Sequence, residues 1–361
     1  MSYLFKSLLS FIVGIVLAEL SSVFVPIALA LVLVIIFVLP ERFRFRDLCK
    51  YLAIAFFSCI LAMQDKADVA IVEKEKSQIY YSLSERIENL ELSEESKAVA
   101  KGILLGDKQA LSRSQKQSVR EAGMSHIFAV SGLHIGIIYL VLFWLLSPMR
   151  FFGLLKTHRL FVISFVWLYV AVIGFPISSI RAALMLSLAV VSWILARNTD
   201  SKHIIASAAL IMLLYDTQQL WDIGFQLSFL AALGIILVQP HLKKRNRLVQ
   251  MFLVTLSAQL MTMPLIAYYF HLVPLFGWVQ GFLVIPLLPF LVYVMAFYLF
   301  FSSLTFLSYP IDFVSHWLFF VAEEVALFEN FCLGGRLLWY PSEIETCVML
   351  ALILALFLKR R

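Results

Sequence analysis

The 361-residue sequence is poor in charge and lacks the common motifs of metal and nucleotide sites. Only 14% of its residues are charged, against about 25% in soluble globular proteins. Its four cysteines, Cys49, Cys59, Cys332 and Cys347, have no C-x-x-C spacing and are predicted to be small core residues. Its histidines form no H-E-x-x-H pair, and no G-x-x-x-x-G-K-[ST] loop is present. We therefore predict no metal, no cofactor, no catalytic residue and no ATP motor in this sequence.

Long apolar runs are abundant instead, and 62% of the residues are apolar. Several runs reach the roughly 20 residues that cross a bilayer as a helix. The sequence predicts an all-α polytopic membrane protein with about 11–12 transmembrane helices and a short, mostly helical outer segment. The predicted parts are N-terminal transmembrane helices at 1–63, an extracytoplasmic segment at 64–125, a channel core at 126–308 and C-terminal helices at 309–361.

The polar segment 64–125 should contain two short helices. Ser93 caps one that ends at Gly106, and Ser112 with Gln115 forms a capping box for one that ends at Gly123. The first half of the segment is acidic and the second half is basic. The basic residues of the second half are Lys97, Lys101, Lys108, Arg113, Lys116 and Arg120, and the last three fall on one helical face.

The remaining apolar runs give a series of expected helices. They lie at 126–147, 159–175, 178–196, 203–215, 223–239, 248–270 and 345–358, with an amphipathic helix at 311–330. The region 271–308 contains Pro274, Pro286 and Pro289, so it is either one kinked helix or two half-helices. Seventeen basic residues fall in the loops of one side, which predicts that both termini are cytoplasmic and that 64–125 faces outward.

Uncharged polar residues inside the apolar helices are the candidate lining of a channel. The stretch Gly123–Gly136 places Ser131 and His134 in an apolar helix, and a histidine there is a functional hypothesis by default. The other candidates are Arg181, Asp222, Gln226, Ser228 and Gln259, while Gly132, Gly136 and Gly224 are expected to allow close helix packing. Three of these residues have a simpler alternative role. Asp222 would be a helix cap, Arg181 would reach the lipid headgroups, and His134 would make an interhelical hydrogen bond.

Five motifs together resemble the ComEC competence-protein family. They are Leu104-Leu-Gly-Asp-Lys, His126-Ile-Phe-Ala-Val-Ser-Gly-Leu-His-Ile-Gly, Ser179-Ile-Arg-Ala-Ala-Leu-Met, Asp222-Ile-Gly-Phe-Gln-Leu-Ser-Phe, and Ser257-Ala-Gln before Pro264. The resemblance covers about residues 85–305. The resemblance implies an inner-membrane channel that passes single-stranded DNA into the cytoplasm during natural transformation. Typical members also carry an OB-fold domain and a metallo-β-lactamase-like domain. Neither is expected here, because the outer segment is short and acidic at first and no histidine-rich motif follows.

The expected partners follow from that resemblance and from the missing motor. They are single-stranded DNA, membrane lipid, an outer DNA receptor, a cytosolic helicase-like ATPase and a separate OB-fold or nuclease chain, with a homo-oligomer left open. Five of the six basic residues of 97–120, namely Lys97, Lys101, Arg113, Lys116 and Arg120, would attract DNA at the outer mouth. Two other functions remain open: a small-solute secondary transporter with broken helices, and an intramembrane enzyme that uses Ser131 or His134.

Overall fold

The computed structural model describes residues 6–13, 77–124, 127–128, 130–148, 155–196, 199–243, 245–271, 273, 276–333 and 340–359. Helices and turns account for these residues and none is in a strand, which confirms the all-α class. The helices expected within 1–63 lie outside the described part, except for a helical stretch at 6–13. The chain divides into two compact units, Met1–Val72 with Val191–Phe229, and Glu73–Val190 with Leu230–Arg361.

The polar segment before the apolar helices folds into short helices. They are α4 (Gln78–Glu88), α5 (Glu94–Leu105), the 3-10 turn η1 (Lys108–Ala110) and α6 (Arg113–Glu121). The predicted caps are confirmed: the Ser93 hydroxyl accepts a hydrogen bond from the Ser96 amide at 3.2 Å, and Ser112 and Gln115 form the capping box. Gly106 ends α5 in the left-handed conformation, with φ = 72°. Helix α4, which begins after the capping residue Ser77, was not predicted from the sequence.

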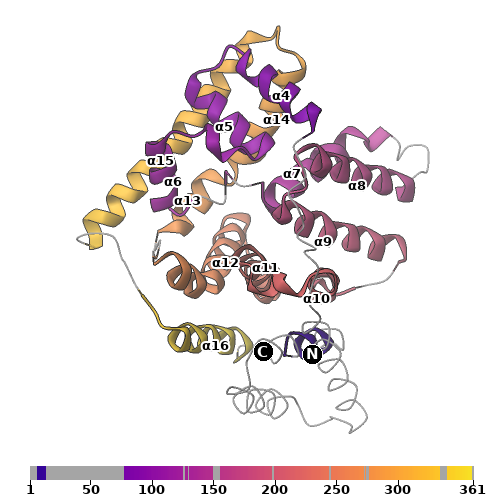
Figure 1. Ribbon diagram of the computed structural model, residues 1–361, viewed down its shortest axis with the longest axis vertical. Helices are drawn as coiled ribbons and strands as arrows, with labels where there is room; N and C mark the ends of the chain where they lie inside the picture. The colour runs from indigo at the N-terminus through magenta and orange to yellow at the C-terminus, as the bar shows by residue number, and fades with distance from the viewer. Residues whose placement is uncertain are drawn as a thin grey trace. The chain divides into compact units, whose positions relative to one another are not determined.

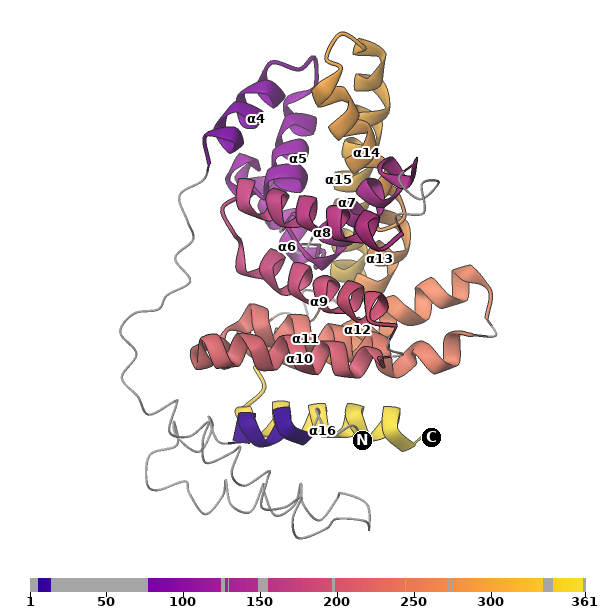
Figure 2. The same ribbon diagram turned by 90° about the vertical axis from the view of Figure 1, so that its right-hand side faces the viewer.

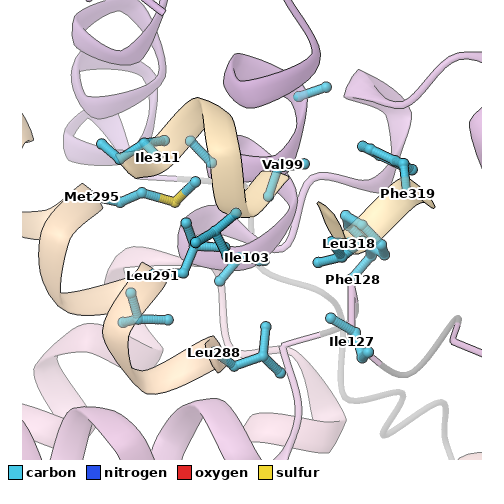
Figure 3. Packing of buried hydrophobic residues seen from close by; sticks show 14 of the residues in the cluster. Val99, Ile103, Ile127, Phe128, Leu288, Leu291, Met295, Ile311, Leu318 and Phe319 are labelled. Carbon is cyan, nitrogen blue, oxygen red and sulfur yellow. The ribbon is translucent and has the colours of Figure 1, made fainter. Parts of the chain in front are cut away.

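These outer helices share a hydrophobic core with α14 (Leu287–Phe300) and α15 (Ser308–Leu333). Figure 1 shows the five helices grouped together, and Figure 3 shows Val99 and Ile103 of α5 facing α14 and α15. Phe128, just after the segment, stacks on Phe319 with ring centroids 5.8 Å apart. The amphipathic helix expected at 311–330 therefore packs its apolar side on the outer segment.

Polar contacts also join α5 to α15. The amide and the hydroxyl of Ser93 both donate to Asp312 Oδ1, at 3.2 and 2.8 Å. The Nδ1 atom of His316 lies 3.6 Å from Glu95 Oε2. The N-terminal end of α5 is thus held by one carboxylate of α15, in addition to its own cap.

Three apolar helices form a second core in the same unit. They are α7 (Gly132–Leu145), α8 (Leu155–Val172) and α9 (Ile177–Ile194), and their buried residues include Ile135, Val166, Val170 and Ala183. The Trp167 indole of α8 donates to the Ser187 hydroxyl of α9 at 3.0 Å. α8 and α9 run alongside each other in Figures 1 and 2. The expected helices at 159–175 and 178–196 are confirmed within a few residues, but α7 begins six residues later than expected.

The proline-containing region 271–308 contains two helices, α13 (Gly277–Val284) and α14. Pro286 occupies the N-cap of α14, where a missing backbone N–H leaves no hydrogen bond unmade. Ile285 and Pro286 between the two helices also have right-handed helical dihedrals, so both readings of this region stay predictions. The last helix, α16 (Glu343–Lys359), packs along α12 (Arg247–Phe270). Cys347 on α16 is exposed, so its assignment to a core was wrong.

The other unit contains α10 (Ser201–Tyr215), the 3-10 turn η3 (Thr217–Trp221) and the first residues of α11 (Ile223–Leu242). Among the described helices, α9, α11 and α12 are long and apolar enough to cross a membrane, while α7, α10 and α14 are apolar but shorter. The protein is therefore an all-α membrane protein, as predicted. The total of about 11–12 spans includes segments outside the described residues and stays a prediction.

Candidate channel-lining site

The start of α7 positions the serine–histidine pair. Ser131 was predicted to lie inside this helix. It is instead the N-cap residue, directly before the first helical residue. His134 is 1% exposed, and its Nδ1 atom lies 3.3 Å from the Ser131 amide nitrogen and 3.1 Å from the Ser131 hydroxyl oxygen. Because an amide can only donate, Nδ1 is the acceptor, and the proton of the neutral ring is assigned to Nε2. The imidazole thus offers an N–H donor inside an apolar helix.

The start of α9 meets the start of α7. The Ser178 hydroxyl donates to the Val130 carbonyl at 2.6 Å, and a Cβ on Gly132 would lie 3.7 Å from the Cβ of Ala182. Arg181, in the first turn of α9, is 4% exposed. A charged side chain at the centre of a bilayer costs roughly 2.5–3.5 kcal/mol on insertion scales. The region where α7 and α9 begin therefore contains two helix N-termini, the imidazole of His134 and the buried guanidinium of Arg181.

A tight turn before α9 sets this geometry. Gly174 and Phe175 have φ values of 87° and 56°, and Pro176 follows directly before the helix. Gly174 takes up this conformation without the steric cost of a Cβ. The chain therefore reverses between α8 and α9, and the polar start of α9 returns toward α7.

The outer helices dock on the residues that lead into α7. The Tyr169 hydroxyl of α8 donates to the Leu104 carbonyl of α5 at 2.7 Å. A Cβ on Gly106 would lie only 2.7 Å from Val130 Cγ2, so the two backbones approach closely because position 106 is glycine. The motif Leu104-Leu-Gly-Asp-Lys and the residues before Gly136 thus meet in space, a contact that the sequence could not reveal.

The remaining predicted lining residues lie elsewhere. Asp222 caps α11 by accepting from the Phe225 amide at 2.6 Å, which confirms its helix-cap reading. The Gln226 amide donates to the Leu220 carbonyl at 2.9 Å, and Ser228, two residues further along, is partly exposed. These three residues, and Gly224, belong to the other compact unit. Gln259 is partly buried on α12, in the unit that contains Ser131, His134 and Arg181.

The glycines differ in how closely other helices approach them. A Cβ added to Gly132 would be in ordinary van der Waals contact with Ala182, whereas a Cβ on Gly136 would meet no atom of the described chain within 4 Å. The packing role predicted for Gly136 thus finds no neighbouring helix among the described residues. Gly234 has the closest approach to backbone, with the Ser257 carbonyl oxygen 2.6 Å from an added Cβ. This contact of α11 with α12 was missed, although glycine within an apolar helix is its usual signal.

The five basic residues that were predicted to attract DNA fall into two groups. Lys97 donates to Glu94 Oε1 at 2.9 Å and Lys101 is ion-paired with Glu88, so α5 and the end of α4 supply the counter-charges of these two lysines. The hydrogen bond to Glu94 raises the pKa of Lys97 above its usual value. Arg113, Lys116 and Arg120 on α6 are exposed and have no ion-pair partner in the described part of the chain. We call these three residues the α6 basic face.

No group of three or more histidine, cysteine or carboxylate side chains that could hold a metal ion occurs among the residues for which positions are described. The Ser131–His134 pair has the spacing of a nucleophile and base, but its histidine also accepts from the Ser131 amide, which is a capping arrangement. The geometry therefore places hydrogen-bond donors and one buried positive charge at the starts of α7 and α9.

Comparison with known proteins gives two relatives and a family. Residues 103–361 match the profile of a family described as "Competence protein". The chain is 27% identical over 201 residues to ComE operon protein 3 of Bacillus subtilis (strain 168), which is 55% of this chain and 26% of that protein. It is 30% identical over 237 residues to an uncharacterized protein of Aquifex aeolicus (strain VF5), 65% of this chain and 54% of the relative. The matched regions thus span about a quarter and about half of these relatives, and no solved structure matches.

Proposed function

The chain belongs to the competence protein family, and on this basis we propose that it forms a helical conduit for single-stranded DNA across the bacterial cytoplasmic membrane. The observation that carries the proposal is the set of polar groups at the starts of α7 and α9, namely Ser131, His134, Ser178 and Arg181. Polar and charged groups in membrane helices cost free energy, so they are typically found where they bind a substrate or contact another helix. These four side chains suit a polyanion better than a cation, because they include an arginine and no carboxylate.

A strand that enters a membrane must exchange the water around its phosphates for protein donors. The N-terminal ends of α7 and α9 carry the positive ends of helix dipoles, which favour anions. Arg181 adds a fixed charge, and the His134 Nε2–H adds a neutral donor. Conduction needs sites that bind weakly enough to release the next phosphate. One buried charge among neutral donors fits that requirement, and Asp222, Gln226, Ser228 and Gln259 are proposed as further lining.

The outer mouth is proposed to lie on the side of α4–α6. The excess of basic residues in the opposite loops supports this orientation, with both termini cytoplasmic. The Tyr268 hydroxyl donates to Glu343 at 3.1 Å, and the rings of His271 and Tyr340 lie 4.5 Å apart. These contacts join the end of α12 to the start of α16, so the two helices run antiparallel, as the orientation requires. The α6 basic face would then meet incoming DNA.

The conduit is proposed to be passive and to depend on other chains. No nucleotide-binding loop occurs in the sequence, so a cytosolic helicase-like ATPase would pull the strand. An outer DNA receptor would deliver it, and a separate OB-fold or nuclease chain would prepare it. A second copy of this chain and the surrounding lipid would complete the wall of the conduit.

Uptake of labelled DNA tests the proposal directly. A strain that lacks this chain should fail to internalise single-stranded DNA while still binding double-stranded DNA at its surface. Reintroduction of the chain should restore uptake. Unchanged internalisation in the deletion strain would remove the proposal.

The 3.1 Å contact between the Ser131 hydroxyl and His134 favours one alternative, an intramembrane enzyme with a serine nucleophile. The substitution His134→Gln separates the two functions. Glutamine at this third helical position keeps a capping hydrogen bond but is not a base. A conduit should retain most of its uptake in this variant, whereas an enzyme should lose its activity. The division of 271–308 into α13 and α14 favours a second alternative, a small-solute transporter, which solute flux into proteoliposomes without DNA would reveal.

A further inference from the structure

A pocket between α13 and α15 lies apart from the starts of α7 and α9. It has a volume of about 290 Å³ and is lined by Phe276, Val279, Glu324, Val325 and Phe328. Two phenyl rings form adjacent walls: Phe276 and Phe328 have centroids 5.1 Å apart and planes inclined at 73°. Val279 and Val325 supply aliphatic surface, and Glu324 is the single charged residue of the lining. The volume suits a small group, since pockets for drug-sized ligands begin at about 300 Å³.

From this lining we propose that the pocket binds an alkylammonium group. Phenyl faces attract cations because of their negative quadrupole, and a carboxylate beside them supplies the opposite charge. Two rings meeting at a steep angle can cover two sides of one methylated or primary ammonium. The valines exclude water from the alkyl part, which strengthens the attraction to Glu324. A phosphate or another anion would be repelled by the same carboxylate.

Glu324 is available to such a cation. It is exposed, and no lysine, arginine or histidine of the described residues forms an ion pair with it. The neighbouring Glu323 is also exposed but does not line the pocket. The pair thus provides an internal comparison, because both residues lie on the same helix and only Glu324 lines the pocket.

The alkylammonium group could come from a free amine or from a zwitterionic lipid headgroup, and the experiment distinguishes these sources. The full chain in detergent is titrated calorimetrically with choline and with its neutral isostere 3,3-dimethyl-1-butanol. The same protein is then placed in nanodiscs of phosphatidylcholine or of phosphatidylglycerol, and the bound lipid is counted by native mass spectrometry. A free amine site predicts choline binding in detergent, and a headgroup site predicts retention of phosphatidylcholine alone.

Three variants test the assignment of the pocket. Glu324→Gln should weaken binding at least about tenfold, and Phe328→Leu, which keeps apolar bulk without the ring quadrupole, about threefold. Glu323→Gln should bind as the parent does. Equal binding of choline and its neutral isostere, or equal losses in the Glu323 and Glu324 variants, would overturn the proposal. So would the absence of any binding by a parent protein that unfolds cooperatively. None of these results depends on DNA uptake, so this proposal and the conduit fail independently.

Discussion

Two groups of residues in the same compact unit carry the DNA proposal, and they differ in burial. Arg181 and His134, at the starts of α9 and α7, are 4% and 1% exposed, whereas the α6 basic face of Arg113, Lys116 and Arg120 is open to solvent. A buried donor acts in a low dielectric and makes few but strong contacts, while an exposed charge is screened by salt. The inner group should therefore control passage, and the outer group should control capture.

The largest expected effect comes from the buried charge. Arg181→Met should lower DNA uptake by about 10- to 100-fold, because a hydrogen bond to a charged group contributes roughly 1.5–3 kcal/mol and each 1.4 kcal/mol is tenfold. Arg181→Lys should give an intermediate loss, since the charge remains but the planar fork is gone. Uptake of labelled DNA is measured at matched membrane levels of protein. The control is Ser164→Ala on α8, where an exposed hydroxyl bonds only to its own helix. If the Arg181→Met protein takes up DNA as well as the parent does, the buried group does not control passage.

A smaller effect is expected from the contact that joins the two regions. Gly106→Ala introduces a Cβ 2.7 Å from Val130 Cγ2 at a position with φ = 72°, so it should destabilise the protein by roughly 1–3 kcal/mol. Gly136→Ala is the matched control, because an added Cβ there meets no atom of the described chain within 4 Å. It should be neutral or slightly stabilising, since alanine is the better helix former. Thermal unfolding in detergent measures both. Equal unfolding temperatures would show that the α5 contact does not hold α7 in place.

The exposed group should show a dependence on salt. Replacing Arg113, Lys116 and Arg120 with glutamine removes three cations, and the slope of log K against log salt for single-stranded DNA should fall by about two. Uptake by the variant should be reduced at low salt and approach the parent near physiological salt. Binding of a fluorescent oligonucleotide to the purified chain is measured across a salt series. An unchanged slope would mean that DNA does not contact α6.

The sequence predicted local features well because their causes are local. The caps at Ser93 and Ser112, the left-handed end at Gly106 and the capping role of Asp222 depend on residues a few positions apart. Contacts between distant segments were not predictable, among them the packing of α15 on the outer helices and the approach of Gly106 to Val130. The sequence contained signals both for and against the late start of α7. The Ser131–His134 cap is a local signal, but the apolar residues before it suggested that the helix continued.

Which basic residues have a counter-charge could not be predicted for the same reason, because it depends on how the helices fold. Lys97 and Lys101 look equivalent to Arg113 in the sequence, yet α5 places them beside Glu94 and Glu88. Net charge counts residues, whereas attraction of DNA depends on charge without a nearby counter-charge. Among the five predicted residues, the α6 basic face is therefore the group that is free to act on a polyanion.

The smallest expected effect belongs to Lys97. Lys97→Gln should leave DNA binding and its salt slope unchanged, because Glu94 already compensates the charge. The pKa of Lys97 is raised in the folded state, so its contribution to stability is present below the unfolded-state pKa and is lost as pH rises through the folded value. The parent and the variant should therefore differ slightly in unfolding temperature at pH 8 and converge above about pH 11. The control is Lys116→Gln, which should change the salt slope but not the unfolding temperature at either pH. A Lys97→Gln protein that binds DNA as weakly as the Lys116→Gln protein would show that ion pairing within α5 does not separate the two groups.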